Sequence, residues 1–130
     1  MDIHLTGLYA CALTIIFLIL QYSVILQRGA SKISINYGED IVLAEKIRRH
    51  GNFIETVPLA LVLMLAAELA GASAIWLHAI GGLLLVGRIL HPLGLKHDVM
   101  ISPLRIAGTM TTQFSMLTAV SCILWLYFKS

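Results

Sequence analysis

Long apolar stretches separated by short polar ones make up nearly the whole chain. Four stretches are long enough to cross a membrane, because a bilayer core needs about 20 mostly apolar residues per helical span. The second is expected to begin well before its apolar run, because helical spacing of apolar residues already starts there. The pattern predicts an all-α integral membrane four-helix bundle, with residues 1–130 as a single domain and spans at about Leu5–Leu26, Ile41–Ala70, Ala74–Leu90 and Ile106–Phe128.

The composition supports a membrane location. Hydrophobic residues make up 58% of the chain, the mean hydropathy is +0.88 and only 12% of residues are charged, against about a quarter in soluble domains. Cys11 and Cys122 lie in apolar stretches without metal-ligand spacing, so no metal site is predicted. Nothing in the charge pattern indicates nucleic-acid binding. The first span is expected to be retained, because its start has no basic region and no cleavage site follows.

The two longer polar segments, about Gln27–Asp40 and His91–Pro103, are separated by two spans and must lie on the same side of the membrane. Only Lys129 falls on the other side. The positive-inside rule therefore places both segments in the cytoplasm and both termini in the opposite compartment. Eight of the nine basic residues lie on the cytoplasmic side, counting helix ends: Arg28, Lys32, Lys46, Arg48, Arg49, Arg88, Lys96 and Arg105.

The second helix carries charged and amide groups inside an apolar span. Arg48, Asn52 and Glu55 are spaced i, i+4 and i+7, so they share one helix face. A carboxylate cannot extend toward anionic headgroups, so Glu55 needs a cation or a bound ligand at its own depth. Two simpler interpretations stay open: Arg48 and Glu55 form a structural ion pair, or the basic residues reach up to lipid phosphates.

Two further helix ends bring polar groups to the same level. The third helix ends with Arg88 and His91 and is expected to stop at Pro92 and Gly94, and the fourth opens with Pro103-Leu104-Arg105. Three helices are therefore predicted to converge on one polar pocket. Guanidinium groups bind carboxylates through paired hydrogen bonds, and Glu55 can hold an ammonium group. A tripeptide with two carboxylates and one amine fits this set.

These residues resemble those of the membrane-associated eicosanoid and glutathione metabolism (MAPEG) family. Its signature of Arg, three residues, Asn, two residues and Glu, commonly followed by Pro, stands here as Arg48, Asn52, Glu55 and Pro58. Gly87-Arg88-Ile89-Leu90-His91 is similar to the end of the family's third helix. Pro103-Leu104-Arg105 is similar to the Pro-x-Arg before its fourth helix. The resemblance thus covers all four spans.

The resemblance implies a homotrimer with glutathione, as co-substrate, held between neighbouring subunits near the cytoplasmic side. Arg105 matches the arginine that stabilises the thiolate. A third-helix tyrosine and a serine after the arginine, both found in the family's synthases, are missing; Ile106 stands in the serine's place. The glutathione-binding residues implied by the resemblance are Arg48, Asn52, Glu55, Arg88, His91 and Arg28.

The predicted function is a glutathione-dependent transferase or peroxidase acting on small hydrophobic electrophiles. Short loops, as in bacterial members of the family, predict a multi-pass protein of the bacterial inner membrane. One alternative is a small proton-coupled multidrug-type transporter, because four short spans with a membrane glutamate also suit that class. Another is a non-catalytic, lipid-binding membrane subunit.

Several polar side chains outside this cluster are interpreted as structural. Glu68 and His78 flank a tight turn at Gly71-Ala72-Ser73 on the far side and are expected at the membrane interface. Small and hydroxyl residues of the fourth helix, such as Thr112 and Ser115, are expected to permit close helix packing.

Overall fold

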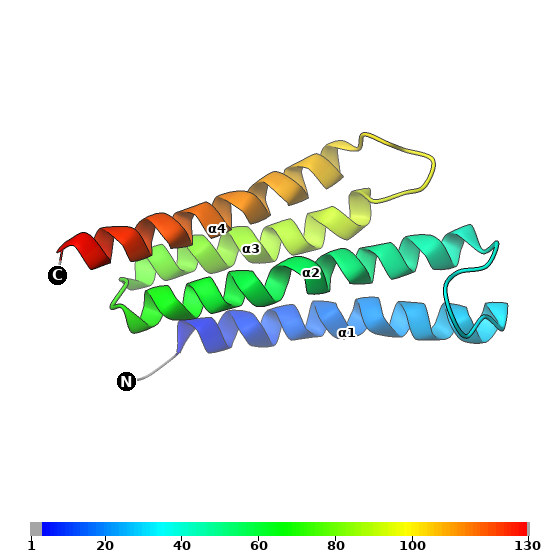
Figure 1. The fold of residues 1–130 in the computed structure, drawn as a ribbon, viewed down its shortest axis with the longest axis horizontal. Helices are drawn as coiled ribbons and strands as arrows, with labels where there is room; N and C mark the ends of the chain where they lie inside the picture. Colours follow the sequence, from blue (N-terminus) through cyan, green and yellow to red (C-terminus); the bar gives the residue numbers. More distant parts are fainter. Residues whose placement is uncertain (1–3, 130) are drawn as a thin grey trace.

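The structure, a computed structural model, describes residues 4–129 and contains four long helices (Figure 1). Each helix is long and apolar enough to cross a membrane. The predicted four-helix membrane bundle is therefore confirmed, while residues 1–3 and 130 of the predicted domain lie outside the described residues. The helices are α1 (Leu5–Ser31), α2 (Ile41–Leu69), α3 (Ala74–Gly94) and α4 (Pro103–Lys129).

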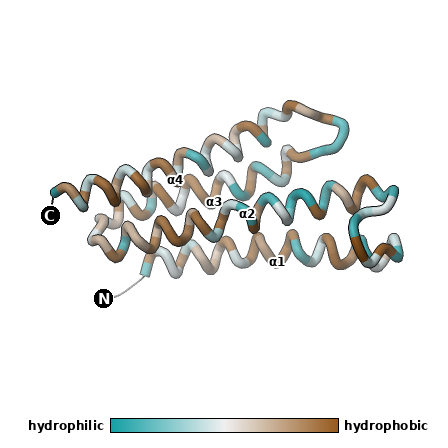
Figure 2. The backbone as a smooth tube through the Cα atoms, in the orientation of Figure 1, coloured by the Kyte–Doolittle hydropathy of each residue, from teal (hydrophilic) through white to brown (hydrophobic). Residues whose placement is uncertain are grey.

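The helices run up and down, and the two longer loops lie at the same end of the bundle, as predicted (Figure 1). The short α2–α3 turn, the start of α1 and the end of α4 lie at the other end, here called the turn end. Helices α1 and α4 pack on opposite sides of the α2–α3 pair and do not contact each other within residues 4–129. Hydrophilic positions gather toward the loop end (Figure 2).

The ends of α1 and α3 differ from the predicted ones, whereas α4 opens where it was predicted to. Helix α1 continues to Ser31, beyond the predicted end at about Leu26, and α4 begins at Pro103, where a proline loses no intrahelical bond. The expectation that Pro92 stops the third helix is wrong, because Pro92 lies inside α3, which ends at Gly94. A proline this close to the end removes a single backbone hydrogen bond, to the carbonyl four residues earlier, and the last turn tolerates that loss.

The α1–α2 loop is fastened by Asp40, the N-cap of α2. Asp40 Oδ1 accepts a hydrogen bond from the backbone N–H of Leu43 (3.0 Å), and Oδ2 accepts from Gln27 Nε2 (2.9 Å) and from the hydroxyl of Ser31. The bonds from Ser31, Gln27 and Leu43 favour the ionised carboxylate and lower the pKa of Asp40 to about 2. The end of α1 and the start of α2 are thereby held together.

The α3–α4 loop is fastened to α2 by Glu45 and Arg49. Glu45 Oε1 accepts from the backbone N–H of His97 (2.7 Å) and lies 2.6 Å from His97 Nδ1. Arg49 donates to the carbonyl of Leu95 (2.8 Å) and to Glu45 Oε2 (3.2 Å). Glu45, His97 and Asp98 bring three potential metal-ligand atoms within 4.8 Å of one another. The contacts of Glu45 and Arg49 hold the loop against α2.

At the turn end, Glu68 caps the start of α1. Its carboxylate accepts from the backbone N–H groups of His4 (3.2 Å), Leu5 (3.0 Å) and Thr6 (2.8 Å), where a negative charge also complements the helix dipole. His78 Nδ1 lies 3.0 Å from the Tyr9 hydroxyl. Both residues thus have the structural roles expected for them.

Helices α3 and α4 form the most extensive helix pair, and glycines let their backbones meet. A Cβ atom added to Gly94 would overlap the backbone nitrogen of Arg105, and one added to Gly108 would lie 2.5 Å from the backbone nitrogen of His91. One added to Gly87 would lie 2.5 Å from the Thr112 hydroxyl. The three contacts, Gly87–Thr112, His91–Gly108 and Gly94–Arg105, are separated by the same numbers of residues along both helices, which run in opposite directions. These contacts fix the register of the pair.

Candidate functional site

A buried guanidinium group, that of Arg88, lies at the centre of the polar residues. Arg88 is only 2% exposed. Its Nη1 donates to Asn52 Oδ1 (3.0 Å) and to Thr56 Oγ1 (2.9 Å), and its Nη2 donates to the carbonyl of Gly108 (3.3 Å). One side chain of α3 therefore joins α2 and α4, and the predicted convergence of three helices is present at this residue.

The charge of Arg88 is held by neutral acceptors alone. Within residues 4–129 no carboxylate lies within ion-pair distance of it, and its buried Nε has no hydrogen-bond partner. Buried charges are ordinarily paired, because an uncompensated one is costly to desolvate. Arg88 therefore gives the interior of the bundle a net positive potential that can attract an anion.

Arg48 and Glu55 form a bidentate ion pair on α2. The Nη1–Oε1 distance is 2.9 Å and the Nη2–Oε2 distance is 3.1 Å. The predicted shared helix face is thus confirmed for Arg48 and Glu55, whose side chains are 58% and 53% exposed in the single chain. Such an open pair on a membrane helix requires a cover, because lipid tails cannot solvate it.

Glu55 and Arg88 lie at the same depth. At 1.5 Å per residue, each lies about 21 Å from the turn end of its own helix. In a hydrocarbon core of about 30 Å, both would lie about 9 Å inside the loop-end boundary. A polar layer therefore crosses the bundle at this depth and reaches its outer surface at the Arg48–Glu55 pair.

His91 lies one turn beyond Arg88 toward the loop end and is 4% exposed. Its backbone packs against Gly108 of α4. This contact places the end of α3 directly against the start of α4.

Two predicted site residues are less closely connected in the single chain. Arg105 is exposed, and within the described part of the chain its side chain makes no hydrogen bond; it lines a cavity of about 250 Å³ at the start of α4. Arg28 turns back into its own loop and donates to the carbonyls of Ile33 (3.3 Å) and Asn36 (2.9 Å). Among residues 4–129, no hydrogen bond or ion pair joins Arg28 to the polar layer.

Comparison with known proteins shows the family of the chain. The model of the MAPEG family matches residues 6–125, a range that includes all of α2 and α3 and most of α1 and α4. The chain belongs to the MAPEG family. The inner membrane protein YecN of Escherichia coli strain K12 is 32% identical over 120 residues, which cover 92% of this chain and 90% of that protein. YecN of Escherichia coli O6:H1 matches equally well, and no solved structure matches at the same level of significance.

The structure of this MAPEG chain adds two acceptors that sequence reasoning missed. Thr56 lies four residues after Asn52, on the same side of α2, and a hydroxyl in an apolar span was the available signal. The carbonyl of Gly108 left no such signal, because every residue carries a carbonyl. Its access to Arg88 depends on the close α3–α4 contact.

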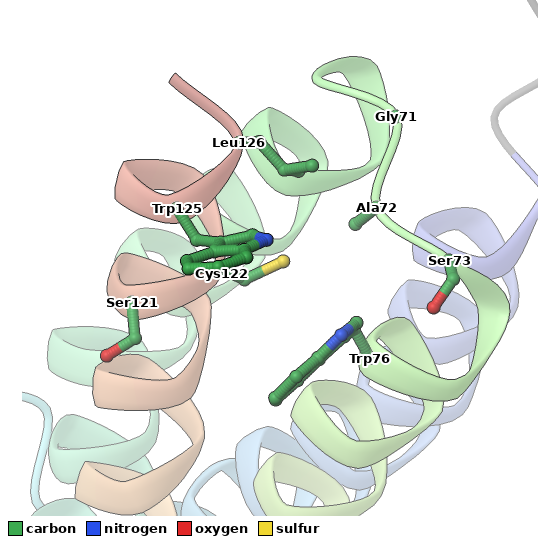
Figure 3. A pocket seen from close by; sticks show the side chains of 8 residues that line it. All are labelled: Gly71, Ala72, Ser73, Trp76, Ser121, Cys122, Trp125 and Leu126. Carbon is green, nitrogen blue, oxygen red and sulfur yellow. The ribbon is translucent and has the colours of Figure 1, made fainter. Parts of the chain in front are cut away.

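A second cavity of the MAPEG chain lies far from the polar layer, at the turn end between α3 and α4. Its volume is about 440 Å³. Trp76 and Trp125 lie on either side of it, with the sulfur of Cys122 between them (Figure 3). No charged residue lines it, so the groups suited to binding a peptide lie at the other end.

Proposed function

We propose that this MAPEG chain binds glutathione and acts as a glutathione-dependent transferase or peroxidase on small hydrophobic electrophiles dissolved in the membrane. The observation that carries this proposal is the polar layer. It combines the open Arg48–Glu55 pair with Arg88, a buried cation that no carboxylate of the described residues neutralises. Two carboxylates and one ammonium group are complementary in charge to the two guanidinium groups and the one carboxylate of this layer.

In this proposal the tripeptide exchanges partners with residues already in contact. A carboxylate of glutathione takes the place of Glu55 on the guanidinium of Arg48, and the freed Glu55 binds the ammonium group. Asn52 and His91 donate to peptide oxygens, and Arg88 holds Asn52 in position while attracting the second carboxylate. The exchange replaces one ion pair with two, so both charges of the Arg48–Glu55 pair stay compensated.

Arg105 then acts on the thiol. A thiol with a pKa of about 8.5 is mostly protonated at neutral pH, and an adjacent guanidinium lowers that pKa. The thiolate attacks an electrophilic carbon, a sulfur–carbon bond forms, and the leaving group departs with its electron pair. With a hydroperoxide, two glutathione molecules are oxidised to the disulfide while the peroxide is reduced to an alcohol and water.

A homotrimer would complete the site. The Arg48–Glu55 pair needs a cover at its depth, and within residues 4–129 of one chain neither Arg28 nor the side chain of Arg105 is bonded to the layer. A neighbouring subunit that packs against this face can cover the ion pair and can also provide binding partners for Arg28 and Arg105. The assembly should therefore have about three times the chain mass of 14.2 kDa in native mass spectrometry.

The proposed location is the bacterial inner membrane, as the name of the YecN relative suggests. The loop end carries eight of the nine basic residues and would face the cytoplasm, with both termini on the opposite side. This orientation gives the site access to the cytoplasm, where thiols are kept reduced.

Isothermal titration of glutathione into the detergent-solubilised protein tests the proposal. We expect binding by the unchanged protein and at least a tenfold weaker affinity for Glu55→Ala, because the ammonium group loses its partner. Glu39→Ala, which removes an exposed loop carboxylate, is the matched control and should bind normally. Arg105→Ala should retain binding but lose most of its conjugation rate with chlorodinitrobenzene. Undetectable binding by the unchanged protein would rule the proposal out.

The two alternative functions make different predictions. A proton-coupled transporter is expected to have a lone carboxylate near the midplane, whereas Glu55 is paired with Arg48 toward one face. Uptake into proteoliposomes driven by a pH gradient would favour the transporter. A non-catalytic lipid-binding subunit would show no conjugation and no effect of Arg105→Ala.

A further inference from the structure

A groove separate from the Arg48–Glu55 pair lies in the loop-end half of the bundle. It is lined by residues of α1, α2 and α3. Its volume is about 420 Å³. Apolar side chains such as Ile19 of α1 and Ile89 of α3 line its walls, and the cations Lys46, Arg49 and Arg88 line its polar part. The groove therefore has an apolar part and a cationic part.

The cations of this groove are incompletely neutralised. Three basic residues and no acidic residue line it. Lys46 Nζ donates to the neutral amide oxygen of Gln27 (2.9 Å), and the buried Nε of Arg88 has no partner. Of these three cations, only Arg49 forms an ion pair within the described part of the chain, with Glu45 at 3.2 Å. An anion in the groove would compensate charge that the protein leaves uncompensated.

The groove lies on a different face of α2 from the proposed glutathione site. Successive helix residues are turned by about 100°, so Arg49 points well away from the face that carries Arg48 and Glu55. Among the lining residues, only Arg88 is also part of the polar layer. A ligand in this groove therefore need not compete with glutathione for Arg48 or Glu55.

We infer that this groove binds an anionic phospholipid of the loop-end leaflet, with its phosphate at Lys46 and Arg49 and an acyl chain between α1 and α3. Lys46 and Arg49 lie nearer the loop end of α2 than Asn52 and Glu55 do, at the level where lipid headgroups are found. From Ser23 to Ile16 the wall of α1 extends about 10 Å into the membrane. This inference is independent of the proposed function.

Native mass spectrometry tests the inference directly. The purified protein would be mixed with equal amounts of dioleoyl phosphatidylglycerol and dioleoyl phosphatidylcholine, which have the same acyl chains and differ in headgroup charge. We expect at least a fivefold preference for phosphatidylglycerol. Lys46→Gln should reduce that preference several-fold. Lys96→Gln removes the same charge from an exposed position at the loop end outside the groove and should leave it unchanged.

A competition arm tests the need for the acyl chain. Soluble glycerol phosphate at millimolar concentration should not displace the retained phosphatidylglycerol, because it cannot occupy the apolar walls. Displacement, equal retention of the two lipids, or a Lys46→Gln protein that behaves like the unchanged one would each overturn the inference. Glutathione titration of the Lys46→Gln protein should be normal, so a failure of the lipid site and a failure of the glutathione site are distinguishable.

Discussion

At the scale of single residues, the polar layer depends on how the charge of Arg88 is accommodated. Its guanidinium has three neutral acceptors, and the side chain of Asn52 is the one that also belongs to the family motif. The motif asparagine thus has a structural role in the single chain in addition to any contact with a ligand. The two roles can be separated by measuring stability and binding independently.

Replacing Asn52 should therefore destabilise the fold. Asn52→Ala removes one acceptor from the buried guanidinium, and a lost hydrogen bond to a charged group costs about 1 to 3 kcal/mol. Thermal unfolding in detergent, without glutathione, measures this loss. Asn52→Asp is the control, because it keeps an acceptor next to Arg88. An unchanged melting temperature for Asn52→Ala would show that the bond to Arg88 contributes nothing.

Asp40 gives the stability of the loop end a pH dependence. Its folded-state pKa of about 2 lies below the ordinary value of 3.8, so its contribution is present above pH 3.8 and is lost as the pH falls through about 2. Asp40→Ala should lower the melting temperature by a few degrees at pH 7. The difference from the unchanged protein should shrink between pH 4 and pH 2. A difference that stays constant over this range would contradict the assignment.

Sequence spacing indicated the Arg48–Glu55 ion pair as one open interpretation, but it did not give the partners of Arg88. Arg48 and Glu55 fall on one helix face by periodicity alone, whereas the partners of Arg88 lie on other helices. Which groups Arg88 reaches depends on how far α3 is rotated toward α2, and rotation is set by packing. The structure joins Arg88 to Asn52 and Thr56.

At the scale of helices, the α3–α4 pair positions the site. Gly87, Gly94 and Gly108 remove side chains from the contact, so the backbones approach closely and His91 comes next to the start of α4. The small residues of α4 were correctly interpreted as packing positions: Thr112 and Ser115 are buried, and Ser115 donates to the carbonyl of Ile80 (2.7 Å). The helix ends were less predictable, because loop fastenings extend a helix beyond its apolar run.

Gly94→Ala should separate α3 from α4 at the loop end. The added methyl group would overlap the backbone of Arg105, which cannot move away as a flexible side chain can. Overpacking of this kind costs about 1 to 3 kcal/mol. The measurement is thermal unfolding, with Gly82→Ala as the matched control because its methyl group meets only the Tyr9 hydroxyl at 3.9 Å. Equal stability of the two variants would argue against the close contact.

At the scale of the whole molecule, the two loops at one end and the short turn at the other predict labelling from opposite sides of the membrane. In a background with Cys11 and Cys122 replaced by alanine, Ser73→Cys should react with a membrane-impermeant maleimide in intact cells. Ser34→Cys should react only after lysis. Both native serines are exposed. The reverse labelling pattern would show that the chain has the opposite orientation, with the polar layer near the other compartment.

Both tryptophans of the chain, Trp76 and Trp125, line the cavity at the turn end (Figure 3). All intrinsic indole fluorescence therefore originates in one leaflet, far from the polar layer. Quenching by brominated acyl chains will report lipid contact at that end alone, and a ligand near Arg88 will change the emission only if the whole bundle rearranges. The native chain thus carries an optical reporter of long-range motion that needs no added label.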